Sequence, residues 1–356
     1  MSGRISAMID FDPNAPSDSD GIFGLPHEEK DAALVLVPVP WEATTSYGAG
    51  TSKGPSAIQK ASSQIDLFDG DVIKPYEPGI FMRPESKEVR AWGKTAKAAA
   101  QKVIEVGGAV EGKPALRKAL KTANVLGAKL NDWVYRETKS LMGAGKIVGL
   151  VGGDHSIPYG AFRAAAETHG RFGLLHFDAH SDTRVAYEGF TWSHASIMYN
   201  AMENIPEIAK IVQVGIRDYC EQEAEFLHAL GGRAKVFFDR ELAARRFSGE
   251  AWTKTAADIV GALPEKVWVT FDIDGLDPKL CPHTGTPVPG GLDFAEVGHV
   301  LGLLARSGRT ILGFDLVEVA PAPGGRDEWD ANVGMRLLYK LAAWTFVSRG
   351  LCKPRG

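Results

Sequence analysis

Short apolar runs alternate with amphipathic stretches along the chain from residue 33 onward. Seven runs are apolar at nearly every position and predict strands, at 33–38, 146–151, 173–178, 211–215, 235–238, 267–272 and 310–315. Because most of these runs do not alternate apolar with polar residues, both faces of each strand are expected to be buried, as in a parallel sheet. The stretches between them have helical spacing and predict helices at 54–63, 157–168, 221–230, 250–262 and 293–306. This order predicts an α/β fold with helices on a parallel sheet.

Residues 86–145 have a different pattern, because they are rich in Lys and Ala and contain no convincing strand. They predict two helices, near 88–105 and 114–142, separated by glycines. We expect this helical segment to pack on the same sheet, with a separate small domain as the alternative. A last helix is predicted at 328–349.

The N-terminal 30 residues form an acidic arm, with Asp10, Asp12, Asp18 and Asp20 among Pro and Ser residues. They contain no apolar core of signal-peptide length. No apolar run in the chain approaches the ~18 residues that a membrane span needs. We therefore expect an arm at 1–30, a single α/β domain at 31–356 and a cytoplasmic location.

Composition narrows the class of protein. The chain has 356 residues, of which 44% are hydrophobic and 24% charged, so a disordered, collagen-like or disulfide-scaffold protein is excluded. The formal net charge of -4 gives no positive field for nucleic acid or anionic membranes, and neither is expected as a partner. The three cysteines, Cys220, Cys281 and Cys352, lie far apart, which favours a reducing compartment.

Candidate chemistry gathers just beyond the carboxyl ends of four predicted strands. Polar residues follow these strands in the segments 152–156 (GGDHS), 178–182 (DAHSD), 272–278 (DIDGLDP) and 315–318 (DLVE). In an open parallel sheet, that edge is where ligand crevices form. The sequence therefore predicts one functional site at this edge.

The spacing within these segments brings ionisable side chains together. Residues two apart in an extended chain point to the same side, so Asp178, His180 and Asp182 can converge, as can Asp272 and Asp274. His155 adds a second imidazole. Four buried carboxylates would repel one another unless cations compensated them, and six side chains suit two divalent ions.

The donor set also bears on the metal. Carboxylates and imidazoles without a thiolate favour Mn²⁺, with Ni²⁺ as a second choice and Co²⁺ or Fe²⁺ left open. Two neighbouring ions would hold a bridging hydroxide at neutral pH, the nucleophile of a hydrolase. Each segment alone has a plainer explanation as a helix cap or a tight turn. Their joint occurrence after buried strands is what favours the metal site.

The same residues resemble the ureohydrolase family, which includes arginases and agmatinases. The resemblance covers GGDHS at 152–156, HFDAHSD at 176–182, TFDIDGLDP at 270–278, TGTPVPGG at 284–291 and DLVE at 315–318. It implies a three-layer αβα fold around an eight-stranded, mainly parallel sheet. It also implies a binuclear manganese-type site and assembly as a homotrimer or homohexamer.

The resemblance assigns roles to individual residues. It implies six metal ligands, with Asp178 and Asp272 bridging the ions: His155, Asp178, His180, Asp182, Asp272 and Asp274. Asp182 would also accept a hydrogen bond from the hydroxide, His194 would shuttle protons and Glu318 would hold the guanidinium group. Physical chemistry agrees, since a carboxylate binds a planar guanidinium through two hydrogen bonds and a nearby acid can protonate the departing amine. The plainer alternative for His194 is a loop histidine with its hydrogen bonds satisfied, and for Glu318 a solvated carboxylate at the end of a strand.

The sequence departs from the family pattern around the pocket. Thr183-Arg184-Val185 replaces the Asn-x-Pro run with which arginase-like enzymes hold an amino-acid head, so arginase activity is not expected. Trp41, Trp192 and His283 are expected to line the substrate pocket, as is Tyr47. For Trp41 and Tyr47, the alternative is that they pack their loop onto the sheet.

These observations predict an agmatinase-like amidinohydrolase that cleaves a guanidino compound to urea and an amine. Agmatine is the first candidate substrate. Free guanidine is the second, because bulky side chains would shorten the pocket, and 4-guanidinobutanoate is the third. A guanidino acid would need a cation at the far end of the pocket, from Arg184 or Arg217. A non-catalytic family member is the remaining alternative, which the intact ligand positions and Glu318 disfavour.

Overall fold

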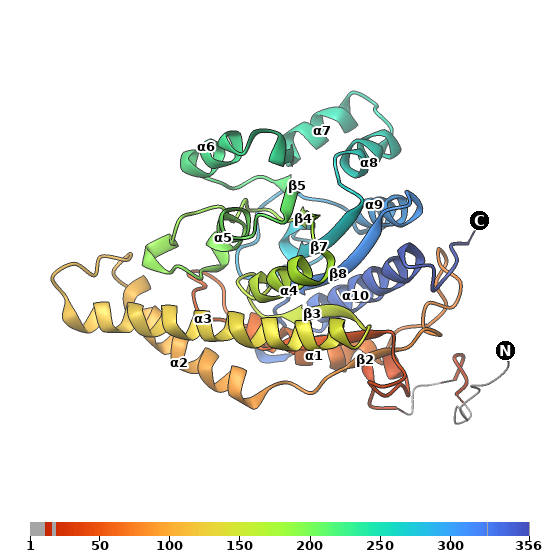
Figure 1. Ribbon diagram of the computed structural model, residues 1–356, viewed down its shortest axis with the longest axis horizontal. Coiled ribbons are helices and arrows are strands. Elements are labelled where there is room, and N and C mark those ends of the chain that lie inside the picture. The colour runs from red at the N-terminus through yellow and green to blue at the C-terminus, as the bar shows by residue number, and fades with distance from the viewer. Residues whose placement is uncertain (1–10, 16–18, 326, 356) are drawn as a thin grey trace.

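The computed structural model describes residues 11–15, 19–325 and 327–355. Its centre is one sheet of eight parallel strands in the order β2-β1-β3-β8-β7-β4-β5-β6 (Figure 1). The strands are β1 (Leu34–Val39), β2 (Ile80–Met82), β3 (Ile147–Gly152), β4 (Phe172–Phe177), β5 (Ile208–Ile216), β6 (Ala234–Phe238), β7 (Lys266–Asp272) and β8 (Thr310–Val317). The expected eight-stranded sheet is confirmed, with β2 as a strand that the apolar pattern did not predict.

Ten α-helices surround the sheet in the described residues. They are α1 (Gly54–Ser62), α2 (Lys87–Ile104), α3 (Pro114–Gly143), α4 (Tyr159–His169), α5 (Ile197–Asn204), α6 (Glu221–Ala229), α7 (Asp239–Phe247), α8 (Trp252–Gly261), α9 (Phe294–Arg306) and α10 (Trp329–Ser348). Successive residues of a strand point to opposite faces, so Leu34 and Leu36 of β1 enter one apolar core while Val35 and Val37 enter the other. Helices α1, α8, α9 and α10 cover the first face and α3, α4 and α5 the second, which gives three layers.

The Lys- and Ala-rich segment forms the long helices α2 and α3. The two helices pack against each other, and α3 also packs against α4. Leu130 and Val134 of α3 belong to the same core as Val35 and Val148 of the sheet. The segment therefore lies on the same sheet, as expected.

Part of the predicted N-terminal arm is buried. Ile22, Phe23 and Leu25 enter the core, and the Phe23 ring meets the Tyr339 ring of α10 at a centroid distance of 5.0 Å. Residues 1–10 and 16–18 of the arm, with Asp10 and Asp18, lie outside the described residues. The domain boundary at residue 31 stays a prediction.

Among the described residues, no helix is both long enough and apolar enough to cross a membrane.

Candidate active site

Four neighbouring strands at the centre of the sheet position the candidate site. Strands β3, β8, β7 and β4 lie side by side, and all four run parallel. Their carboxyl ends lead into the segments that carry His155, Glu318, Asp272 and Asp178 respectively. The parallel arrangement therefore brings to one edge residues that lie far apart in the sequence.

The first group of ligating atoms surrounds His155. Its Nδ1 lies 2.9 Å from Asp178 Oδ2, 3.1 Å from Asp182 Oδ2 and 3.3 Å from Asp272 Oδ2. All four side chains are buried. Three carboxylates thus converge on one nitrogen of a single imidazole.

The second group surrounds His180. Its Nδ1 lies 3.1 Å from Asp274 Oδ2 and 3.4 Å from Asp178 Oδ1. Asp178 contributes one oxygen to each group, so its carboxylate lies between them. The structure therefore brings all six predicted metal ligands together, in two adjoining groups that could each hold an ion.

The electrostatics of these groups call for cations. Burial, and then the neighbouring Asp178 carboxylate, raise the pKa of Asp182 to about 7. Burial, followed by the charges of Asp274 and Asp178, raises the pKa of Asp272 well above its usual range. For His180, burial lowers the pKa, but the Asp274 and Asp178 carboxylates outweigh it and hold the pKa well above the usual value. Buried like charges are thus poorly compensated by the protein alone, and two divalent ions fit this donor set.

A buried chain of hydrogen bonds fixes the far side of the His155 ring. His155 Nε2 lies 3.0 Å from Thr270 Oγ1, and the Thr270 hydroxyl donates to Asp315 Oδ1 at 2.8 Å. The indole N–H of Trp268 donates to the other Asp315 oxygen at 2.7 Å. Because the Thr270 hydroxyl donates to Asp315, it accepts from Nε2–H, and Nδ1 is left to face the carboxylates.

His176 is a site residue that sequence reasoning missed. Its Nδ1 accepts from the Gln213 amide at 2.9 Å, so its Nε2–H donates to Asp178 Oδ2 at 2.8 Å. Burial lowers the pKa of His176, which agrees with a neutral ring. The ring therefore orients Asp178. The sequence spacing could have identified His176, since it precedes Asp178 by two residues and residues two apart in a strand point to the same side.

Glu318 offers a free acceptor beside these groups. Its Oε1 accepts from the backbone N–H of His155 at 2.9 Å, whereas its Oε2 is buried without a hydrogen-bond partner. A Cβ added at Gly285 would lie 3.4 Å from that oxygen, so glycine leaves the space beside it open. Burial, and then the Asp272 and Asp154 charges, raise the pKa of Glu318 well above its usual range. A bound cation would relieve that unfavourable charge.

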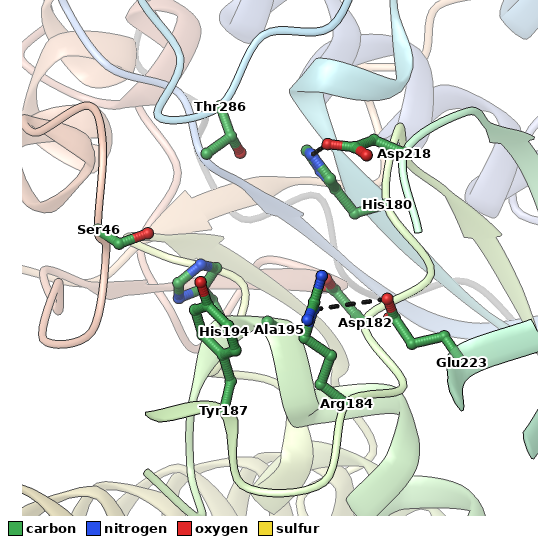
Figure 2. Close-up of a pocket in the computed structure, with 10 residues that line it drawn as sticks. All are labelled: Ser46, His180, Asp182, Arg184, Tyr187, His194, Ala195, Asp218, Glu223 and Thr286. Atoms are coloured by element: carbon green, nitrogen blue, oxygen red, sulfur yellow. Dashed lines mark ion pairs between the residues drawn. The ribbon is translucent and has the colours of Figure 1, made fainter. Parts of the chain in front are cut away.

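A cavity of about 140 Å³ opens over the metal-ligand cluster (Figure 2). Three predicted site residues line it: His180, Asp182 and His194. His194 Nδ1 lies 3.1 Å from Thr44 Oγ1, and burial, followed by the charges of His180 and His155, lowers the pKa of His194 to about 4. The ring is therefore neutral at pH 7.

The remaining lining residues come from loops, short 3₁₀-helical turns and the first turn of α6, and of these only Arg184 is a pocket candidate from the sequence. They are Ser46, Arg184, Tyr187, Ala195, Asp218, Glu223 and Thr286. The sequence offers Arg184 as a cation for a guanidino acid, and Figure 2 shows its side chain pointing into the cavity. These residues add two carboxylates and one arginine to the cavity lining.

The three side chains expected as pocket walls, Trp41, Trp192 and His283, do not line this cavity. Trp41 is buried in the core beside Gly93 of α2, and Trp192 packs against Tyr159 at a ring-centroid distance of 4.8 Å. His283 Nδ1 lies 2.7 Å from Asp330 Oδ2. None of the three lines the cavity, because each has a partner elsewhere. Trp41 shares a core with strand residues such as Val37 and Val148, which agrees with the alternative that it packs its loop onto the sheet.

Two further pocket candidates are also placed elsewhere. Tyr47 does not line the cavity and is 84% exposed. Arg217 donates to the backbone carbonyls of Asp274 and Val288 and holds the loops that follow β7. Its donors are therefore already used, and Arg184 is the cation that remains in the pocket.

Comparison with known proteins finds similarity along most of the chain. The model of the arginase family matches residues 32–343. The N(1)-aminopropylagmatine ureohydrolase of Synechocystis sp. is 31% identical over 318 residues, which cover 88% of this chain and 89% of that protein. The agmatinase of Proteus mirabilis is 31% identical over 317 residues, which cover 88% and 89% of the two chains.

The fold is also similar to that of solved structures. The crystal structure of the agmatine ureohydrolase of Thermoplasma volcanium matches with a TM-score of 0.69 at 22% identity. The match covers 93% of this chain and 96% of that one.

Proposed function

Because the chain belongs to the arginase family, we propose that it is an agmatinase-like ureohydrolase, which cleaves a C–N bond of a guanidino compound to release urea and an amine. The observation that carries the proposal is the unpartnered Oε2 of Glu318, which is buried beside the cluster of carboxylates and imidazoles. A guanidinium cation presents planar N–H donors that such an oxygen can accept.

The cluster would hold two divalent ions, for which we propose Mn²⁺ first and Ni²⁺ second. Its ligands would be His155, Asp178, Asp182 and Asp272 for one ion, and His180, Asp178, Asp272 and Asp274 for the other. Bound there, the ions would lower the pKa of a water molecule and so supply a nucleophile at neutral pH.

The side chains around the cluster would position the substrate and move protons. Glu318 would fix the guanidinium group and neutralise its charge, which places the central carbon for attack. Asp182 would orient the attacking water by accepting a hydrogen bond from it. His194, neutral at pH 7 and held by Thr44, would accept the proton that the attacking water gives up and pass it to the departing amine.

The lining of the cavity favours a guanidino group with a tail over guanidine alone. Free guanidine became a candidate because three bulky side chains were expected to shorten the pocket, and none of them lines it. The cavity extends from His180 and Asp182 to Arg184, Asp218 and Glu223, so polar side chains are available to a tail that guanidine lacks. We therefore propose a short-chain guanidino substrate.

Urea release tests this proposal. The purified protein is loaded with Mn²⁺ or Ni²⁺ and assayed with agmatine, guanidine, 4-guanidinobutanoate and arginine. We expect urea from a short-chain substrate, and a loss of roughly 10²–10³ in kcat for Glu318→Gln with both ions still bound. Absence of urea from every substrate, with two ions bound, would refute the proposal.

Two further properties are proposed on the family resemblance. The chain would assemble as a homotrimer or homohexamer and act in the cytoplasm. Light scattering of the purified protein checks the first.

A further inference from the structure

We propose that Arg184 forms a subsite for a carboxylate in the wall of the pocket, so that the preferred substrate is a guanidino acid rather than agmatine. This subsite deepens the proposed function, on which it rests, because it names the tail of the substrate. The reaction at the guanidinium end is the same for either tail.

The backbone and side chain of Arg184 are both held in place. Its backbone N–H donates to Ala195 O at 3.0 Å, which ties its loop to the residue after His194. Its Nε lies 3.5 Å from Glu223 Oε2, and its guanidinium carbon lies 4.9 Å from the centre of the Tyr187 ring. In Figure 2 the side chain rises between Tyr187 and Glu223 toward the centre of the cavity. The guanidinium is thus oriented from two sides before any ligand binds.

The two terminal nitrogens of the Arg184 guanidinium have unused hydrogen-bond donors. Within the part of the chain that the structure describes, Glu223 and Tyr187 are the only partners of the Arg184 side chain, and they leave Nη1 and Nη2 without a hydrogen bond. Glu223 is itself engaged, because its oxygens accept from the backbone N–H groups of Thr183 and Cys220 at 3.1 and 2.9 Å. The Arg184 side chain is only 39% exposed. A partly buried fork of unused donors matches a carboxylate, which binds it through two parallel hydrogen bonds.

Asp218 is the competing feature, since it would suit the ammonium tail of agmatine. Its carboxylate lies 3.9 Å from His180 Nε2 and is 70% exposed, so water screens its charge. An ammonium tail in this small cavity would also lie beside the Arg184 cation, which repels it. Glu223 is more buried than either group, but its oxygens already accept from the backbone N–H groups of Thr183 and Cys220 and lie beside Arg184. The groups left for a ligand are therefore the unused donors of Arg184, and they select an anionic tail.

Kinetics with matched substrates test the subsite. kcat/KM is measured for 4-guanidinobutanoate and agmatine with the metal-loaded wild type, Arg184→Gln and Asp218→Asn. We expect the wild type to prefer the acid. Arg184→Gln should shift the ratio of the two kcat/KM values at least tenfold toward agmatine, mainly through a higher KM for the acid. Asp218→Asn should not shift the ratio toward agmatine.

Two variants separate recognition from general effects. Arg184→Lys keeps the charge without the fork and should restore part of the preference for the acid. Arg240→Gln removes an exposed arginine of α7, outside the cavity, and should leave the ratio unchanged.

The subsite is overturned if the wild type prefers agmatine and Asp218→Asn removes that preference. It is also overturned if Arg184→Gln lowers kcat/KM equally for both substrates, because an equal loss would mean that Arg184 supports the structure and does not select the tail. Calorimetric binding of the two compounds separates this failure from failure of the proposed function. Tighter binding of the acid without urea release would refute the proposed function and support the subsite. Urea release from agmatine alone would support the proposed function and refute the subsite.

Discussion

At the scale of single residues, the orientation of His155 depends on side chains that touch neither the cavity nor the proposed ions. Thr270 and Asp315 hold its Nε2–H, which turns Nδ1 toward Asp178, Asp182 and Asp272. Groups of this kind in metal sites fix the ring and raise its basicity, and their loss typically costs 10–100-fold in metal affinity. They are as much a part of the site as the ligands.

This role predicts the effect of removing the Thr270 hydroxyl. Thr270→Val should weaken binding of Mn²⁺ by roughly 10–100-fold, because the ring loses its acceptor. Competition with a chelating dye measures the affinity. Thr255→Val deletes another buried hydroxyl, on α8, and serves as the control. Equal affinities for Thr270→Val and the control would contradict this role.

Two proposed site residues also have an unusual backbone conformation. Asp182 has φ +57° and Glu318 has φ +61°, in the left-handed region that non-glycine residues rarely adopt. Such conformations cost on the order of 1–3 kcal/mol each and tend to occur at functional sites. No pattern of apolar positions signals them, so sequence could name these residues but not how their side chains are aimed.

At the scale of elements, helix α3 supports the loop that carries the pocket residues. The Asn124 amide donates to Gly189 O at 3.0 Å, and its Oδ1 accepts from the Thr191 N–H at 2.9 Å. Nearby, a Cβ added at Gly127 would lie 2.9 Å from Trp192 Cβ, so helix and loop are in close contact. The long helix is therefore a support for the segment between Asp182 and His194.

Removing the hydrogen bonds between Asn124 and this loop should loosen the loop, although Asn124 lies outside the cavity. Asn124→Ala removes two hydrogen bonds to the loop, so amide hydrogen exchange across residues 183–195 should quicken. A small misplacement of pocket groups should lower kcat/KM by about tenfold. Thr122→Ala on the same helix removes a hydroxyl that donates to Lys118 O within the helix, and it should leave both measurements unchanged. Unchanged exchange in Asn124→Ala would show that the loop is held by other contacts.

The elements also show what sequence could and could not predict. Strands such as β7 and β8 were predicted because they are buried on both faces and read as continuous apolar runs. The edge strand β2 has only three residues, and α7 is mostly charged with only Leu242 buried, so neither leaves a periodic signal. An aromatic residue in a loop can pack either way, and the choice between core and cavity for Trp41 depends on tertiary contacts that sequence does not display.

At the scale of the whole molecule, the sheet concentrates negative charge at one buried edge. Asp182 shows the consequence for stability. Its pKa rises from 3.8 to about 7 in the folded, metal-free chain, so between these pH values the folded protein keeps a proton that the unfolded chain has lost. Its contribution to stability is thus present at low pH and is lost as the pH rises through about 7. A divalent ion bound to this carboxylate would take the place of that proton.

Metal binding should therefore stabilise the protein most at high pH. With Mn²⁺ at about 100 times its Kd, each site adds roughly 2.7 kcal/mol, so Tm should rise by several degrees. Because the ligands must lose protons to bind the ion, the rise in Tm should be larger at pH 8 than at pH 6. Thermal melts with Mn²⁺ and with EDTA at both pH values measure it. In Asp182→Asn the side chain no longer titrates, so the dependence of the rise on pH should weaken. A rise that is equal at the two pH values in the wild type would mean that these carboxylates are already ionised without metal.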